Sequence, residues 1–392
     1  MSTSSVRLGR PAPSLRDRAT RRGSTLRRFD WVLVAAVLAL AGLGALLVWS
    51  ATRQRMQSAG MDPQSFLKRH LINLAIGLVF GLVTAKFDYR MLRAYAPIVY
   101  VASCIGLVAV LVVGTTINGA HSWIVIGGGV QVQPAEFAKV GLIVSMAMLL
   151  GEKRDGERVP RGSDVVLVLA LAAVPMGLVM LQPDFGTTMV LAFVILGVLA
   201  VSGASGRWIA GLVLAGLLSA VLAVHLGVLQ QYQLDRFKAF TNPATDSQGA
   251  GYSTRQARIA IGSGGLTGKG LFKGSQTNGH FVPEQQTDFV FTVAGEELGL
   301  LGSGTIILLL GVVLWRGLSI AARAPDLFGR LVATGVAAWF AFQSFVNIGM
   351  TLGIMPVTGL PLPFVSYGGS AMFANLMAVG LLLNVHLSSN EP

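Results

Sequence analysis

Long apolar stretches separated by short polar ones dominate the chain from residue 31 onward. An apolar helix of about 17–25 residues is long enough to cross a bilayer. Ten such segments lie at residues 31–50, 71–87, 94–114, 134–150, 165–181, 186–203, 208–227, 290–315, 329–354 and 364–387. We therefore expect an all-α integral membrane protein with ten transmembrane helices, in which a basic tail (residues 1–29) precedes one membrane domain (residues 30–388).

Composition supports a membrane protein. Of the 392 residues, 53% are hydrophobic and 12% are charged, and this charged fraction is about half that of a typical soluble domain. The single cysteine, Cys104, and the five histidines exclude a disulfide framework and a cysteine-based metal site.

The distribution of basic residues predicts the orientation. The first 28 residues contain eight arginines and one acid, Asp17. Directly before an apolar span, such a tail indicates a cytoplasmic segment that faces lipid head groups, rather than a nucleic-acid-binding segment. An even number of spans then places both termini in the cytoplasm. Basic residues in two other cytoplasmic loops agree with this orientation, whereas four in the first external loop, residues 51–70, do not.

A mostly polar segment, residues 228–289, separates the seventh and eighth spans and is extracytoplasmic in this orientation. Because long structureless connections are uncommon, its amphipathic stretches, Gln230–Phe240 and Gly251–Ile261, predict helices along the membrane interface. The segment ends at Asp288, at the start of the eighth span. A carboxylate beside lipid is costly and is therefore a candidate for chemistry, although Thr287 or Asp288 would also serve as a helix cap.

Other unusual side chains lie near the same membrane face, and each has a structural alternative. Glu136 and Lys139 share one face of a helix that Pro134 begins, either as a structural ion pair or as a cavity pair in which Lys139 meets a phosphate. Asp184 either caps the sixth span or lines a cavity or cation site. Trp123 either anchors the protein at the interface or stacks on a sugar.

The basic residues Arg255, Arg258 and Lys269 are interleaved with glycines between residues 262 and 270. The pattern matches neither a P-loop, because Ser263 stands where its first glycine is required, nor the dinucleotide-binding motif, because Thr267 replaces its third glycine. We expect a tightly turning loop whose cations meet an anionic head group.

Several of these segments together resemble the SEDS family (shape, elongation, division and sporulation) of bacterial membrane proteins, from about Phe29 to Leu387. The resemblance is carried in order by Gly119-Ala120…Trp123-Ile124, Gln133-Pro134-Ala135-Glu136…Lys139, Gln182-Pro183-Asp184…Gly186-Thr187, Ile259–Gln276, Pro283-Glu284…Thr287-Asp288-Phe289 and Pro361–Ser370. The Ile259–Gln276 segment is similar to the branch that acts in rod elongation more than to the division branch. The family usually has a basic residue before the tryptophan, where this chain has His121-Ser122.

The resemblance implies a peptidoglycan glycosyltransferase that polymerises lipid II outside the bacterial cytoplasmic membrane. It implies a class B penicillin-binding protein as partner, together with other membrane proteins of the elongation complex and no nucleic acid. Asp288 matches the family's essential acid, and Trp123, Glu136, Lys139 and Asp184 match positions of its central cavity. As a hypothesis, Asp288 is the general base, and Lys139, Arg255, Arg258 or a divalent cation (Mg²⁺ or Mn²⁺) stabilises the leaving pyrophosphate.

Three other functions remain open at this point. A lipid II flippase would also use buried charges along a polar path, but the spans show no inverted repeat. A scaffold that only recruits the crosslinking partner leaves those charges unexplained. A division polymerase would share the same chemistry.

Overall fold

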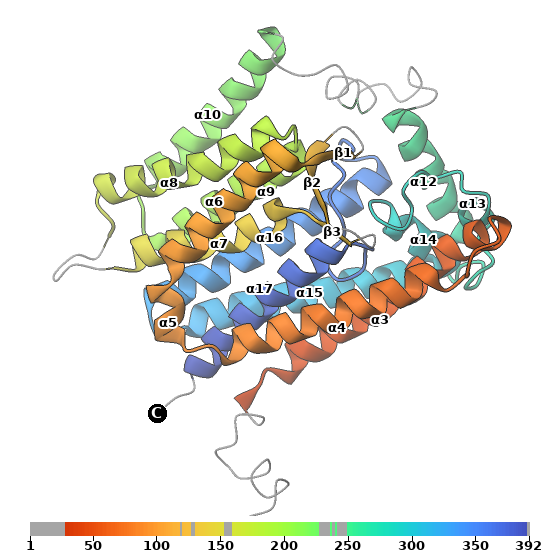
Figure 1. Ribbon diagram of the computed structural model, residues 1–392, viewed down its shortest axis with the longest axis horizontal. Coiled ribbons are helices and arrows are strands. Elements are labelled where there is room, and N and C mark those ends of the chain that lie inside the picture. Colours follow the sequence, from red (N-terminus) through yellow and green to blue (C-terminus); the bar gives the residue numbers. More distant parts are fainter. Residues whose placement is uncertain are drawn as a thin grey trace, which may run out of the picture.

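The computed structural model describes residues 28–117, 120–126, 130–152, 159–226, 236, 240 and 249–389. Within these ranges every predicted span corresponds to a helix (Figure 1): α3 (Trp31–Ser58), α4 (Ser65–Lys86), α6 (Ala96–Val113), α7 (Pro134–Gly151), α8 (Gly162–Leu181), α9 (Phe185–Ser202), α10 (Gly206–His225), α15 (Gly299–Arg323), α16 (Leu327–Leu352) and α17 (Gly369–Ser388). Nine of these helices are long and apolar enough to cross a membrane. In α10 the apolar part is shorter and covers Gly206–Leu222. The multi-pass helical membrane fold is confirmed for the described residues.

Polar side chains and glycines determine where several helices begin and end. The Asp30 carboxylate accepts a hydrogen bond from the Leu33 N–H at the start of α3, and Asp326 accepts one from Gly329 at the start of α16. Gly203 and Gly353 end α9 and α16 with φ of 88° and 78°, a backbone conformation that glycine adopts without steric cost.

The bundle has an interior and a lipid-facing exterior. Helices α7, α16 and α17 are mostly buried, whereas α4, α6 and α10 keep most of their apolar side chains at the surface, as expected where lipid replaces the protein core. Helices α4 and α17 pack closely because Gly81 and Gly380 face each other: a Cβ at Gly380 would collide with the Gly81 carbonyl oxygen. Figure 1 shows α10 leaning out of the bundle.

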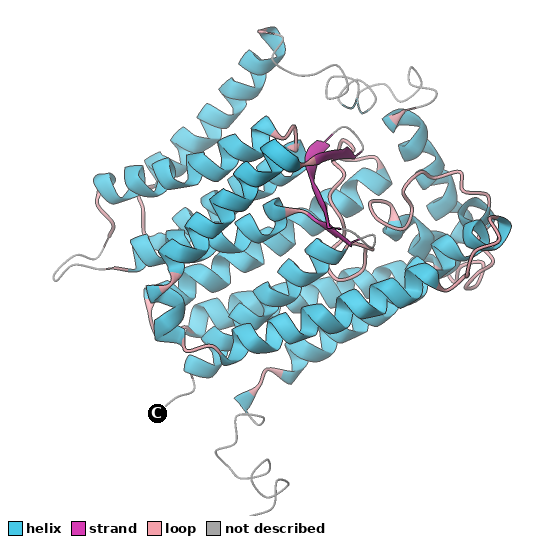
Figure 2. Cartoon of the chain, in the orientation of Figure 1, coloured by secondary structure: helices cyan, strands magenta, loops and turns pink. Residues whose placement is uncertain are grey.

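Smaller elements gather at the two ends of the bundle (Figure 1). A three-stranded antiparallel sheet of β1 (Thr115–Ile117), β2 (Ala120–Ile126) and β3 (Val130–Val132) lies at the same end as α12 (Ala250–Gly264), α13 (Ser275–Asn278) and α14 (Val290–Glu297). Helix α5 (Tyr89–Ala94) and the C-terminus lie at the other end. Figure 2 shows this sheet among the helices. The sequence predicts a polar external segment at Gly114–Gln133, and the structure shows that this segment forms the three strands.

Two of the four basic residues that disagree with the predicted orientation have partners within the protein. Helix α3 continues to Ser58, eight residues beyond its predicted end. Arg53 therefore lies on the helix, where its guanidinium carbon stacks 5.2 Å from the centre of the Phe272 ring. Lys68 forms an exposed ion pair with Asp62 at 2.6 Å.

The eighth predicted span is not continuous, which corrects the expected helix at 290–315. It divides into α14 and α15 at Leu298, and Gly299 has a φ of 65°. The carbonyls of Glu296 and Glu297 accept hydrogen bonds from Lys269 N–H (3.0 Å) and Gly270 N–H (2.9 Å). The glycine-rich loop thus supplies hydrogen-bond donors to the last two carbonyls of α14. These carbonyls are then not available for the next helical turn, and the helix ends there.

A helix is confirmed at Gly251–Ile261, as α12; its position along the membrane interface stays a prediction. The other predicted helix, Gln230–Phe240, lies outside the described residues except for Arg236 and Phe240, and so does nearly all of the basic tail, residues 1–27.

Candidate functional site

Asp288 lies in a tight turn directly before α14. The Glu284 carbonyl accepts hydrogen bonds from the N–H groups of Thr287 (3.1 Å), Asp288 (3.1 Å) and Phe289 (3.3 Å), and Glu284 adopts a left-handed φ of 49°. The Asp288 side chain is partly exposed. The turn therefore holds this carboxyl group at the end of the bundle that carries α12 and α13, with most of its surface covered by protein.

The surroundings of Asp288 favour its protonated form. They raise its pKa from 3.8 to about 7, mainly through desolvation and then through the negative charge of Glu284, with a smaller contribution from Asp184. Arg236 and a hydrogen bond from Thr287 act in the opposite direction. A carboxyl group that titrates near neutral pH is suited to exchange a proton with a substrate.

A single amide holds Asp288 against the loop before α17. The Asn347 Nδ2 atom on α16 donates to the backbone carbonyls of Asp288 (2.8 Å) and Leu360 (2.7 Å). A Cβ added at Gly359 would lie 3.5 Å from Asp288 Oδ2, so the loop backbone lies beside the carboxylate. Arg236 Nη1 reaches the Thr358 carbonyl of the same loop at 3.4 Å.

Asp184 caps α9, as the structural alternative predicted. Its Oδ1 accepts from Thr187 N–H at 3.0 Å, and its Oδ2 accepts from Thr187 Oγ1 at 2.8 Å and from Gln133 Nε2 at 3.0 Å. Asp184 also acts electrostatically on Asp288. The two aspartates therefore belong to one region: Gly359 lies beside the Asp288 carboxylate, and Thr358 and Leu360 lie beside Gly186, two residues after Asp184.

Trp123 lies on the central strand of the small sheet. It is paired with Thr115 of β1, and its side chain is partly exposed. The neighbouring His121 N–H donates to the Gln182 carbonyl at 3.1 Å, so the sheet is fastened to the turn that carries Asp184. Stacking on a sugar and interfacial anchoring are both compatible with this position.

Glu136 and Lys139 form an ion pair inside the bundle. Lys139 Nζ lies 2.7 Å from Glu136 Oε1, and both side chains are almost fully buried. The same ammonium group donates to Gln343 Oε1 at 3.1 Å and lies 4.4 Å from the centre of the Trp339 ring. Gln343 in turn donates to the Pro361 carbonyl at 2.7 Å. This placement favours the structural ion pair, because Lys139 has no surface through which to meet a phosphate.

The three predicted cations of the long loop separate into two places. Arg255 and Arg258 are exposed on α12, and the buried face of this helix joins the Asp288 turn because Ala257 clusters with Val282 and Phe289. Lys269 is instead committed to an ion pair with the buried Glu296 at 2.8 Å.

Glu296 anchors the glycine-rich loop. Its carboxylate also accepts from the backbone N–H groups of Gln276 (2.9 Å) and Thr277 (2.8 Å). The adjacent Glu297 points elsewhere and accepts from Ser50 of α3 at 2.7 Å. The predicted tightly turning loop is confirmed. Its Lys269 stabilises the loop through the ion pair with Glu296.

Sequence reasoning missed Asn347, Gln343, Arg236 and the charge of Glu284. Asn347 and Gln343 carried a detectable signal, because an uncharged polar side chain inside a membrane span needs an internal partner. Glu284 lies within a motif noted in the sequence, but only the structure shows that its charge raises the pKa of Asp288.

Metal ligands are sparse in the described part of the chain. It contains no group of three or more His, Cys, Asp or Glu side chains that could hold a metal ion. Asp184 and Asp288 interact electrostatically, and a Mg²⁺ ion bound by one or two carboxylates would take its remaining ligands from water and substrate phosphates.

Comparisons with known proteins agree with this arrangement. The family model for cell cycle proteins of the FtsW/RodA/SpoVE type matches residues 30–391. The chain is 38% identical to a probable peptidoglycan glycosyltransferase FtsW of Trichlorobacter lovleyi, over 93% of this chain and 95% of the relative. It is also 38% identical to the peptidoglycan glycosyltransferase MrdB of Escherichia coli, over 91% and 93%.

Solved structures extend the similarity to three dimensions. The crystal structure of the rod shape determining protein RodA of Thermus thermophilus matches with a TM-score of 0.69 and 34% identity, covering 93% of this chain and 98% of that one. A structure described as "Structural coordination of polymerization and crosslinking by a peptidoglycan synthase complex" matches with a TM-score of 0.76 and 33% identity, covering 93% and 99%. The chain belongs to the FtsW/RodA/SpoVE family of membrane proteins, the SEDS family.

Proposed function

We propose that this protein is a peptidoglycan glycosyltransferase that polymerises lipid II into glycan strands and releases undecaprenyl pyrophosphate. Membership of the family and the names of its relatives supply the reaction class. The observation that carries the proposal is the partly buried carboxyl group of Asp288, with its pKa raised to about 7, in the turn directly before α14.

Asp288 acts as the general base in this reaction. It takes the proton from the 4-hydroxyl of the acceptor's GlcNAc, and that oxygen attacks C1 of the donor's MurNAc. The C1–O bond to pyrophosphate breaks as the new glycosidic bond forms, with inversion at C1. Because pyrophosphate leaves without being protonated, one carboxylate suffices where a glycosidase needs two.

The leaving pyrophosphate needs positive charge nearby. The exposed Arg255 and Arg258 on α12, and Arg236 near Asp288, are the side chains whose positions suit that task. A divalent cation, Mg²⁺ or Mn²⁺, held between Asp184 or Asp288 and the phosphates would add to it. We assign Lys139 and Lys269 to holding the fold, because each is already paired with a glutamate.

The proposal includes location and partners. The protein lies in the bacterial cytoplasmic membrane with both termini in the cytoplasm and Asp288 on the outer face, in accord with the arginine-rich tail. A class B penicillin-binding protein crosslinks the strands it makes, in accord with its similarity to a structure described as a peptidoglycan synthase complex. Other membrane proteins of the elongation complex bind beside it. The equal 38% identity to FtsW and MrdB fits a role in division as well as in elongation.

Purified protein supplied with lipid II tests the activity. The wild type should produce glycan strands, and Asp288→Asn should produce none while inserting and purifying normally. Asp62→Asn, which removes an exposed carboxylate in the first external loop, is the matched control and should polymerise normally. Normal polymerisation by Asp288→Asn would refute the role of the base. Movement of lipid II across vesicles without strand formation would instead indicate a flippase, and neither activity would indicate a scaffold.

A further inference from the structure

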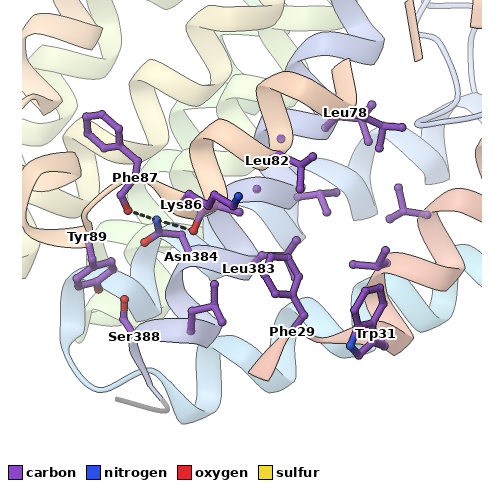
Figure 3. Close-up of a pocket in the computed structure, with 18 of the residues that line it drawn as sticks. Phe29, Trp31, Leu78, Leu82, Lys86, Phe87, Tyr89, Leu383, Asn384 and Ser388 are labelled. Carbon is purple, nitrogen blue, oxygen red and sulfur yellow. Dashed lines mark hydrogen bonds between the residues drawn. The ribbon is translucent and has the colours of Figure 1, made fainter. Parts of the chain in front are cut away.

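A groove of about 1110 Å³ opens between three helices at the end of the bundle opposite Asp288 (Figure 3). Its walls come from residues 31–38 at the start of α3, residues 78–86 at the end of α4 and residues 376–388 of α17. Helices α3 and α4 are joined by the short turn at residues 59–64, so the groove lies between the ends of this helix pair that are remote from the turn.

The groove is separate from the proposed glycosyltransferase site. Ala51 near the other end of α3 accepts a hydrogen bond from Gln285 of the Asp288 turn, whereas Trp31 at the start of α3 lines the groove. Twenty helical residues at 1.5 Å each place the two about 30 Å apart. In the proposed orientation the groove therefore opens in the cytoplasmic leaflet.

Apolar side chains stand exposed along the groove. Leu38 on α3 and Leu82 on α4 are 43% and 50% exposed, and Trp31 at the mouth is 56% exposed. At the bottom of the groove, α4 and α17 approach each other closely at Gly81 and Gly380, both of which line the groove. In a bilayer such a surface is covered by hydrocarbon, and its concave shape suits a single chain.

Charged groups lie at the mouth of the groove and next to it. The exposed Lys86 is the last residue of α4, and Asp88 lies beside it. Asp30 is paired with Arg316 at 2.6 Å, Asp326 accepts from Tyr89, and Arg28 and Arg323 lie close to Asp30 and Arg316 around His386. Lys86 and Asp88 are the charged residues that line the groove; Asp30 lies between the lining residues Phe29 and Trp31 in the sequence, so the cluster of Arg28, Arg316 and Arg323 around Asp30 and His386 lies next to the groove. Seven more arginines precede Arg28 in the sequence, against Asp17 alone.

We propose that this groove binds an anionic glycerophospholipid of the cytoplasmic leaflet. One acyl chain lies between α3 and α4 against α17, and the phosphodiester lies beside Lys86. Basic pockets between membrane helices on the cytoplasmic side bind anionic head groups by the same combination of charge and apolar contact. Figure 3 shows Lys86 between Phe87 and Leu82, with Leu78 farther along the same helix.

Photocrosslinking tests the site directly. Full-length protein is placed in nanodiscs of phosphatidylcholine with a small fraction of phosphatidylglycerol that carries a diazirine in its acyl chain, and the labelled peptides are identified by mass spectrometry. We expect labels on residues 31–38, 78–86 and 376–388. Leu82→Trp should fill the groove and reduce labelling there at least tenfold. Lys86→Gln should reduce it about fivefold, the loss expected for one cation near the membrane surface.

Matched variants separate the groove from the general lipid annulus. Leu167 on α8 is 55% exposed but does not line the groove, so Leu167→Trp should leave labelling unchanged, as should Arg207→Gln at the start of α10. Asp288→Asn should also keep the lipid, so the result does not depend on glycosyltransferase activity. Equal labelling by diazirine phosphatidylcholine, labels scattered over the lipid-facing helices, or displacement of the lipid by undecaprenyl phosphate alone would each overturn the proposal.

Discussion

The side-chain amide of Asn347 binds the backbone carbonyl of Asp288 at 2.8 Å and that of Leu360 at 2.7 Å. Asn347 is fully buried, and its Oδ1 has no hydrogen-bond partner. One side chain thus sets the spacing between the turn that presents the proposed base and the loop that runs beside it. Because the bond is to the backbone, it orients Asp288 without competing for the carboxylate.

Loss of this amide should impair catalysis more than substrate binding. Asn347→Leu removes both hydrogen bonds and leaves two carbonyls unsatisfied, so the Asp288 turn is free to shift. A displacement of about 1 Å at a catalytic group costs on the order of 100-fold in rate, and we expect a loss of this size in kcat for lipid II polymerisation with KM little changed. Ser344→Ala is the control, since Ser344 is buried on the same helix without a partner. Equal effects of the two substitutions would contradict a positioning role for Asn347.

The pH dependence of polymerisation should report the ionisation of Asp288. Its pKa is raised to about 7, and a general base works only when ionised, so kcat/KM should rise as the pH increases through about 7. Glu284→Gln removes the nearest like charge that raises this pKa. The acid limb of the profile should therefore move to lower pH, and kcat/KM at pH 6 should increase. An unchanged acid limb in Glu284→Gln would show that another group controls it.

The ionised form of Asp288 should lower the free energy of unfolding of the protein. A carboxyl group whose folded pKa lies above its unfolded value binds its proton more tightly in the folded state, so stability declines as the pH rises from the unfolded pKa, about 4, through 7. Asp288→Asn abolishes this penalty. Its Tm, measured in detergent, should exceed that of the wild type at pH 8, and the difference should shrink at pH 5. A higher Tm at both pH values by the same amount would point to a cause other than ionisation.

The buried pair of Glu136 and Lys139 can be tested for a structural against a substrate-binding role. Glu136→Gln or Lys139→Met leaves one charge unpaired inside the bundle, which costs about 3–5 kcal/mol. Replacing both residues removes that penalty and should restore much of the Tm. If the pair is structural, polymerisation should return with stability in the double variant. A stable but inactive double variant would instead give Lys139 a direct role with substrate.

Much of the fold could be predicted because each membrane span leaves its own signal. A run of about twenty apolar residues identifies a span whatever its neighbours are, and Pro134 and Asp326 mark helix starts by local chemistry. The break at Leu298 and Gly299 had no such signal. It depends on hydrogen bonds from Lys269 and Gly270, nearly thirty residues earlier, and only the folded chain brings these groups together.

The candidate site was predictable for residues whose position in the chain is itself unusual. Asp288 stood at the edge of an apolar span, and the structure gives it a partly exposed, strongly perturbed carboxyl group. Lys139 and Lys269 stood in equally unusual places, yet each is paired with a glutamate. A charge beside lipid indicates that a partner is required, and only the tertiary structure shows whether that partner is another side chain or remains to be supplied by a substrate.

The break between α14 and α15 affects how the protein can adapt to bilayers of different thickness. Membrane helices adapt to a thicker or thinner hydrocarbon layer chiefly by changing their tilt. Because α14 is a separate helix, held by the glycine-rich loop and by Ser50 of α3, a tilt of α15 need not carry Asp288 with it as a rigid rod would. The depth of the carboxylate relative to the membrane surface is then set by the residues packed around α14, and the backbone at Gly299 can accommodate changes in lipid composition.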